Sequence, residues 1–133
     1  MNTDVIIYVV DDDEAIRLSL AKLIASADLP VECFESCDEF LANFDRSAVG
    51  CLLLDVNMPG KSGLDLLETI SKTAKRLAII VMSGYGEDEI AAIALNRGAA
   101  DFLQKPFQYE VLIDRITKAI HQKRMTGDKS AES

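Results

Sequence analysis

The chain has 133 residues, of which 14 are lysine or arginine and 22 are aspartate or glutamate, so its formal net charge at pH 7 is −8. This length suits one domain and is too short for two ordinary ones, and 49% hydrophobic with 27% charged residues is typical of a folded globular chain. So acidic a composition argues against binding nucleic acid or an anionic membrane through the domain's own charge.

The first half of the chain alternates short β-branched runs with stretches of helical periodicity. Residues 5–10 form a continuous apolar run, the pattern of a strand covered on both faces. Residues 14–27 carry apolar side chains at helical spacing, and residues 31–34 form a short strand after a Leu-Pro break. A Ser-x-x-Glu capping box predicts a helix over residues 36–43. Residues 51–54 form a third strand that leads into an aspartate.

The second half repeats the same alternation. Apolar spacing predicts a helix over residues 64–74, and the run at 78–82 predicts the fourth strand. Residues 87–97 open with three acids, which suit the positive end of a helix, and stop at a glycine. A fifth strand over residues 100–104 precedes a last amphipathic helix over 108–124.

Strictly alternating strands and helices predict an α/β fold. We expect a five-stranded parallel sheet in the flavodoxin-like (βα)5 order 2-1-3-4-5, with helices on both faces. A closed eight-unit barrel needs about 250 residues and is excluded by length. We expect residues 1–124 to form this domain and the polar, aperiodic residues 125–133 to be a disordered tail or linker.

The cysteine and hydropathy patterns indicate the cellular compartment in which the domain is located. The apolar runs are far shorter than the ~20 residues that span a bilayer, and the first residues show no signal-peptide pattern. The three cysteines are odd in number and lack metal-motif spacing, which fits a reducing environment. We therefore predict a cytoplasmic domain with no membrane association.

Polar residues stand at the carboxyl ends of the predicted strands, where open α/β sheets bind ligands. These residues are, in strand order, Asp11 and Asp12, Asp55, Ser83 and Lys105. The first and third strands are expected neighbours, so the three acids should meet, and like charges about 4 Å apart repel by about 4 kcal/mol at an effective dielectric of about 20. Such a cluster requires a cation or shifted pKa values. Carboxylates with water suit Mg²⁺ better than metals that prefer softer ligands.

Each placement alone also has a purely structural explanation. Aspartates after strands form turns and cap helices, and Asp13 suits the N-cap of the first helix. Here two strands end in acids, a third ends in a hydroxyl residue and a fourth ends in a Lys-Pro pair. Chance is a poor explanation for all four together. The joint pattern favours a functional site over four unrelated turns.

Five motifs in this order resemble the receiver domain of bacterial two-component response regulators. They are residues 9–13 (VVDDD), 54–60 (LDVNMPG), 82–86 (MSGYG), 98–102 (GAADF) and 105–107 (KPF). The resemblance covers residues 5–123. The first and third motifs further resemble the FixJ-like branch, whose members usually carry a C-terminal helix-turn-helix domain.

The resemblance implies a phosphoacceptor and a metal site. Asp55 would accept a phosphoryl group from the histidine of a sensor kinase or from a small acyl phosphate. Asp12 and Asp55 would bind Mg²⁺ directly, with Mn²⁺ as a substitute. The backbone carbonyl of Asn57 would be a third ligand, and Asp11 would act through water.

The resemblance also assigns the residues that respond to phosphorylation. Ser83 would donate its hydroxyl to a phosphoryl oxygen, and Lys105, in a cis peptide bond to the following proline, would neutralise charge there. Phe102 would be the switch aromatic that turns inward as Ser83 moves, although an ordinary core or edge aromatic is an equally open interpretation. Asn57 and Tyr85 occupy the positions that tune phosphoryl lifetime.

The implied partners are a sensor histidine kinase and a second copy of the domain. A phosphorylation-dependent homodimer would use the fourth helix, fifth strand and fifth helix, with Arg97, Asp101 and Arg115 as candidates for reciprocal ion pairs. A simple solvated face is the alternative for these charges. The output would be transcription, through a C-terminal DNA-binding domain absent from these residues. The domain would catalyse only its own phosphotransfer and slow dephosphorylation, so we do not expect an enzyme.

Other functions fit these residues less well, among them a phosphotransfer histidine module, which is a helical bundle, whereas His121 lies on the last predicted helix. A haloacid-dehalogenase-type phosphatase requires a second aspartate two residues after the nucleophile, where this chain has Asn57. A nucleotide-binding flavodoxin-like protein requires a glycine-rich loop after the first strand, where this chain has three acids. A degenerate receiver that only binds partners remains the closest alternative, but every expected site residue is present.

Overall fold

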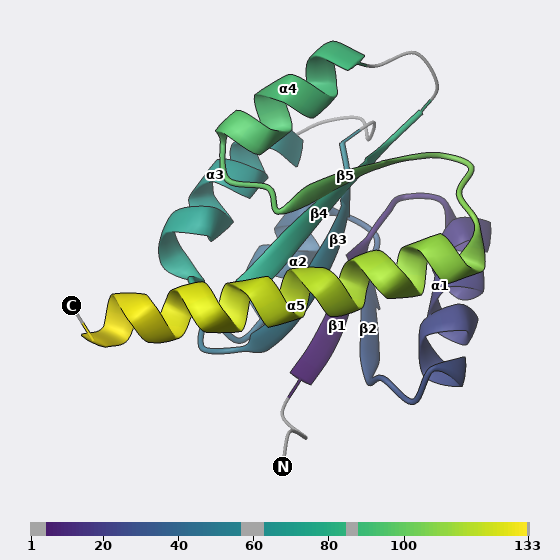
Figure 1. Cartoon of the computed structure of the whole chain (residues 1–133). Coiled ribbons are helices and arrows are strands. Elements are labelled where there is room, and N and C mark those ends of the chain that lie inside the picture. The colour runs from purple at the N-terminus through teal and green to yellow at the C-terminus, as the bar shows by residue number, and fades with distance from the viewer. Residues whose placement is uncertain (1–4, 57–62, 85–87, 133) are drawn as a thin grey trace.

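The computed structural model describes residues 5–56, 63–84 and 88–132, and within them five strands alternate with five helices (Figure 1). The strands are β1 (Val5–Val10), β2 (Val31–Phe34), β3 (Val49–Asp55), β4 (Leu77–Ser83) and β5 (Asp101–Gln104). The helices are α1 (Glu14–Ser26), α2 (Cys37–Asn43), α3 (Gly63–Thr73), α4 (Asp88–Asn96) and α5 (Tyr109–Glu132).

The sheet is parallel throughout and has the order β2-β1-β3-β4-β5, as the sequence predicts. Because β1 lies between β2 and β3, the chain builds outward in both directions from β1. Val10 of β1 pairs in register with Leu54 of β3, and Asp55 pairs with Met82 of β4. This register brings the carboxyl ends of β1, β3 and β4 to one edge of the sheet.

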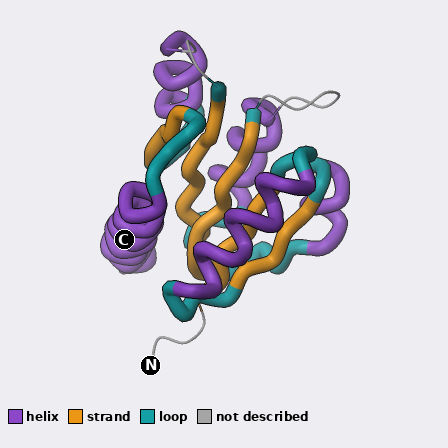
Figure 2. The backbone as a smooth tube through the Cα atoms, turned by 90° about the vertical axis from the view of Figure 1, so that its right-hand side faces the viewer, coloured by secondary structure: helices purple, strands orange, loops and turns teal. Residues whose placement is uncertain are grey.

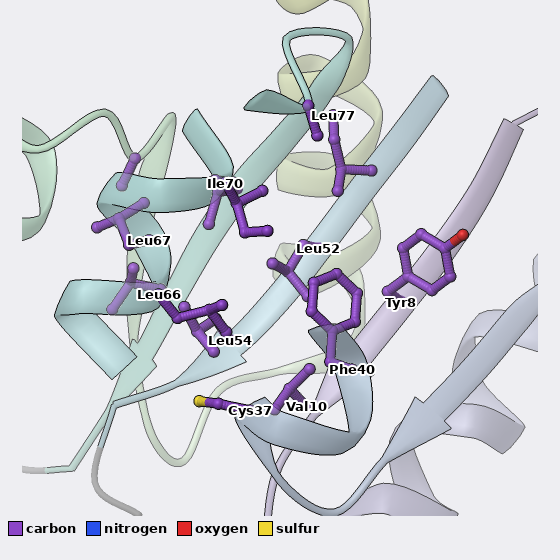
Figure 3. Close-up of a cluster of buried hydrophobic side chains, with 14 of the residues drawn as sticks. Tyr8, Val10, Cys37, Phe40, Leu52, Leu54, Leu66, Leu67, Ile70 and Leu77 are labelled. Atoms are coloured by element: carbon purple, nitrogen blue, oxygen red, sulfur yellow. The ribbon is translucent and has the colours of Figure 1, made fainter. Parts of the chain in front are cut away.

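Successive strand residues face two separate hydrophobic cores, with helices on both sides of the sheet (Figure 2). One face of β1 presents Ile7 and Val9 to α1 and α5. Its other face presents Tyr8 and Val10 to a cluster of α2, α3 and α4 side chains, part of which Figure 3 shows around Phe40. Burial on both faces explains the unbroken apolar runs in the strands.

Side-chain caps confirm two predicted helix starts. The Asp13 carboxylate accepts from the N–H groups of Ala15 and Ile16 at the start of α1. At α2, the Ser36 hydroxyl accepts from the Glu39 N–H at 3.0 Å. Glu39 Oε1 returns a bond by accepting the N–H of the residue before Ser36, at 2.8 Å. The capping box is therefore formed, with its return bond one residue earlier than in the standard pattern.

The end of α5 differs from the prediction. The helix continues to Glu132, so the described residues 125–132 of the segment expected to be a disordered tail or linker are helical. This segment contains one glycine and no proline, and a single glycine costs a helix only about 1 kcal/mol. At 24 residues α5 is long, but neither it nor another helix of the described residues has the length and hydropathy of a membrane span.

Candidate functional site

Three carboxylates meet at the carboxyl ends of β1 and β3. One oxygen each from Asp11, Asp12 and Asp55 lies within 4.8 Å of the other two. Asp11 and Asp55 are 0% and 3% exposed, whereas Asp12 is on the surface. The predicted convergence of these acids is confirmed, and its cause is the pairing of β1 with β3.

Asp11 is bonded through both its backbone and its side chain. Its N–H donates to the Phe34 carbonyl at 3.1 Å, and its own carbonyl accepts from Arg17 Nη1 at 2.7 Å. Its Oδ1 accepts from the Asp13 N–H at 3.0 Å, and its Oδ2 accepts from Lys105 Nζ at 2.8 Å. A buried carboxylate is tolerated only when it is paired in this way. Asp11 therefore ties β2, α1 and the end of β5 to one point.

Lys105 places a positively charged ammonium group beside two of the acids. Its Nζ lies 2.8 Å from Asp11 Oδ2 and 3.4 Å from Asp55 Oδ2. Burial by itself would lower the pKa of Lys105, but the hydrogen bond to Asp11 and the charges of Asp55 and Asp11 outweigh it and raise the pKa above its ordinary value. The peptide bond from Lys105 to Pro106 is cis, as the resemblance implies. Lys105 is therefore charged at neutral pH and held between two acids.

Ser83 and Phe102 lie on the two strands beside the acids. Ser83 is fully buried at the end of β4, and its carbonyl accepts from the Lys105 N–H at 2.7 Å. Phe102 is half-buried on β5, opposite Val81, and packs against the core of the α2, α3 and α4 side. The other two predicted residues, Asn57 and Tyr85, lie outside the described residues.

The donor set fits a hard divalent cation. Three carboxylate oxygens close together, with Asp12 on the solvent side, leave room for the waters that Mg²⁺ retains. Softer ligands of the described residues lie elsewhere: Cys33 is on β2, Cys37, Cys51 and Met82 are in the cores, and His121 is on α5. The chemistry of the cluster therefore suits Mg²⁺ or Mn²⁺ and not zinc or copper.

Comparison with known proteins decides the family. Residues 7–117 match the response regulator receiver domain. The chain belongs to this family. The receiver is 44% identical over 115 residues to the response regulator protein TodT of Pseudomonas putida, covering 86% of this chain and 51% of TodT. It is 40% identical over 124 residues to the transcriptional regulatory protein FixJ of Azorhizobium caulinodans, covering 91% and 57% of the two chains.

A solved structure supports the same assignment. Full-length FixJ from B. japonicum matches the receiver with a TM-score of 0.83 and 36% identity, over 98% of this chain and 64% of that one. The receiver spans about half the length of the curated relatives it matches. The motifs at the strand ends thus identified the family correctly from sequence.

The residues predicted to pair across a dimer are already paired within the receiver. Arg115 Nη1 of α5 donates to Asp101 of β5 at 2.8 Å. Arg97, just after α4, lies 3.3 Å from Asp65 and 3.9 Å from Glu68 on α3. Reciprocal pairing between two copies would have to exchange these internal contacts.

Sequence reasoning missed one residue of the site. Arg17, on the first turns of α1, donates to the Asp11 carbonyl at 2.7 Å. The only signal in the sequence is a cation six positions after Asp11, which is too weak to stand out. A side chain that bonds to a backbone carbonyl can have any residue type as its partner, so the sequence shows no complementary pair of charges.

Proposed function

We propose that this receiver accepts a phosphoryl group on Asp55 in a Mg²⁺-dependent reaction and changes conformation in response. The observation that carries the proposal is the surroundings of Asp55. Its buried carboxylate has two further acids within 4.8 Å and the Lys105 ammonium 3.4 Å from its Oδ2. Acids for a cation and a lysine for phosphoryl oxygens are the parts that phosphoryl transfer needs.

In the proposed reaction, an Asp55 carboxylate oxygen attacks the phosphorus of the donor. The new O–P bond forms as the P–N bond of a phosphohistidine breaks, and the electron pair of that bond stays on the imidazole. Lys105 neutralises charge on the phosphoryl oxygens, and the Ser83 hydroxyl donates to one of them. Asp12, Asp55 and the Asn57 carbonyl would hold Mg²⁺ directly, and Asp11 through water. The bound ion would draw charge from the transferred group.

The same contacts provide the proposed switch. Hydrogen bonds to charged groups contribute about 1.5–3 kcal/mol each, and Ser83 and Lys105 gain a phosphoryl partner only in the modified state. Shifting a population from 1:99 to 99:1 takes about 5.5 kcal/mol, which two or three such bonds supply. Phe102 is the proposed aromatic of the switch, and Asn57 and Tyr85 are proposed to set the phosphoryl lifetime.

The proposal includes partners and location. A sensor histidine kinase would be the donor, and the phosphorylated receiver would dimerise through α4, β5 and α5 to control transcription. The relatives support this, because FixJ is a transcriptional regulatory protein and TodT is a response regulator. The three free cysteines support a cytoplasmic setting. The receiver would act on its own aspartate and not as an enzyme on other molecules.

Acetyl phosphate tests the proposal directly. With Mg²⁺, the wild-type receiver should gain about 80 Da on intact mass, the mass of one added phosphoryl group. Chelation of Mg²⁺ and the substitution Asp55→Asn should both abolish the gain. Asp114→Asn, which removes an exposed acid from α5, is the control and should gain mass as the wild type does. An unchanged wild-type mass, or equal labelling of the Asp55→Asn variant, would refute the proposal.

A further inference from the structure

Arg17 contacts the acidic turn from the helix that follows it. We propose that Arg17 is a positioning residue for the cation site, and that its guanidinium fixes the turn from which Asp12 reaches toward Asp55. This inference rests on the proposed function, because it concerns the same Mg²⁺ site. It assigns a role to a residue that is neither a ligand of the ion nor a partner of the phosphoryl group.

Hydrogen bonds hold the turn between β1 and α1 at both of its ends. Arg17 Nη1 donates to the Asp11 carbonyl at 2.7 Å, and the Arg17 N–H donates to the Asp13 carbonyl at 3.0 Å. The Asp13 N–H donates to Asp11 Oδ1 at 3.0 Å, and the Asp13 side chain caps α1. Arg17 is therefore bonded to the residue before Asp12 through its side chain and to the residue after Asp12 through its backbone.

The carbonyl that Arg17 contacts belongs to the peptide group joining Asp11 to Asp12. Peptide groups are planar, so fixing this oxygen fixes the plane from which the Asp12 Cα and side chain project. Asp12 is exposed, whereas its neighbour Asp11 is fully buried. The exposed acid thus depends on its backbone for orientation, and Arg17 bonds to that backbone.

A charge effect and a positioning effect of Arg17 have opposite signs. A nearby positive charge repels Mg²⁺, so removing it for electrostatic reasons alone would tighten Mg²⁺ binding. Loss of an orienting contact behind metal ligands weakens binding, commonly by about 10–100-fold. The direction of the change in Mg²⁺ affinity therefore separates the two roles.

Mg²⁺ affinity measured by titration calorimetry tests the assignment without relying on phosphorylation. Arg17→Met removes the donor and the charge, and Lys22→Met removes one charge from an exposed position of the same helix. We expect the Mg²⁺ Kd to rise about tenfold or more in Arg17→Met and to stay at the wild-type value in Lys22→Met. Arg17→Lys should restore most of the affinity, because a single N–H bond to the carbonyl is what the side chain supplies.

Thermal melts accompany each titration to report folding. If Arg17→Met does not fold, Arg17→Gln, whose shorter side chain lacks the charge, takes its place with the same expected rise in Kd. A folded variant with an unchanged or lower Kd would overturn the assignment. Failure of the wild type to gain mass from acetyl phosphate while it still binds Mg²⁺ would overturn only the proposed phosphorylation, and the calorimetry would still decide the role of Arg17.

Discussion

Replacement of Lys105 by methionine should destabilise the unmodified receiver and make its stability depend more strongly on Mg²⁺. The substitution keeps most of the side-chain volume and removes the ammonium that contacts two acids at 2.8 and 3.4 Å. It leaves Asp11 and Asp55, at 0% and 3% exposure, without the Lys105 ammonium. The variant therefore isolates the electrostatic role of Lys105.

The structure sets the size of this effect. Removing one partner of a buried ion pair costs about 3–5 kcal/mol, because the other charge stays buried. Lys105 is 22% exposed and Asp11 keeps the Asp13 N–H, so we expect a smaller loss than for a fully buried pair, about 2–3 kcal/mol. For a chain of this length that corresponds to a fall in Tm of about 8–12 °C.

Urea unfolding with and without Mg²⁺ measures the effect. Lys118→Met is the matched control, because its pair with Asp114 on α5 is 69% and 54% exposed, and such pairs contribute less than about 1 kcal/mol. The proposed Mg²⁺ would bind the folded state, and at a hundred times its Kd a bound ligand adds about 2.7 kcal/mol to the free energy of unfolding. The gain should be larger in Lys105→Met than in the wild type, where the proposed ion would share the acids with the Lys105 ammonium.

The pH dependence gives a second check on the same reasoning. The pKa of Lys105 is raised in the folded state, so its contribution is complete below the unfolded value of about 10.4 and is lost as pH rises through the folded value. The wild type should therefore lose stability from this group only in alkali. A deficit in Lys105→Met below about 1 kcal/mol at pH 7 would refute the pairing argument.

Two further predictions concern the sheet and the thiols. Gly50→Ala should destabilise the receiver by more than about 4 kcal/mol in urea unfolding, because a Cβ there would lie 1.8 Å from the Ile6 carbonyl oxygen. A variant with a normal unfolding midpoint would contradict the packing of β1 on β3. Of the three cysteines, only the exposed Cys33 should react with a thiol reagent in the native state, because burial encloses Cys37 and Cys51 and raises the pKa of the Cys51 thiol. Reaction of two or three thiols before denaturation would contradict this.

The order of elements could be predicted because β1, β3 and β4 are continuous apolar runs and stretches of helical periodicity separate the strands. The errors lie at the ends. β3 runs over Val49–Asp55 and not only over residues 51–54, because Val49 and Gly50 pair with β1 although glycine has a low strand propensity. The extension of α5 to Glu132 has a similar origin, since helix propagation carries past a polar segment that lacks apolar periodicity.

The site divides into what topology determines and what side chains determine. The meeting of Asp11, Asp12 and Asp55 follows from the strand order, which the sequence pattern predicts. Lys105 lies closer to Asp11 than to Asp55. This difference depends on the geometry of the folded site and could not be predicted from the spacing of the residues in the sequence. Arg17 was missed for the same reason.

The ion pairs of the α4, β5 and α5 face also limit how a dimer could gain affinity. The Arg115–Asp101 pair is 40% and 31% exposed within one chain. Exchanging it for the same pair between two chains replaces one exposed contact by another, each worth about 0–1 kcal/mol. Such an exchange can set the register of two copies but adds little binding energy. The affinity of the proposed dimer must therefore come from apolar area, and α4 offers it in Ile93 and Leu95, which are 39% and 51% exposed.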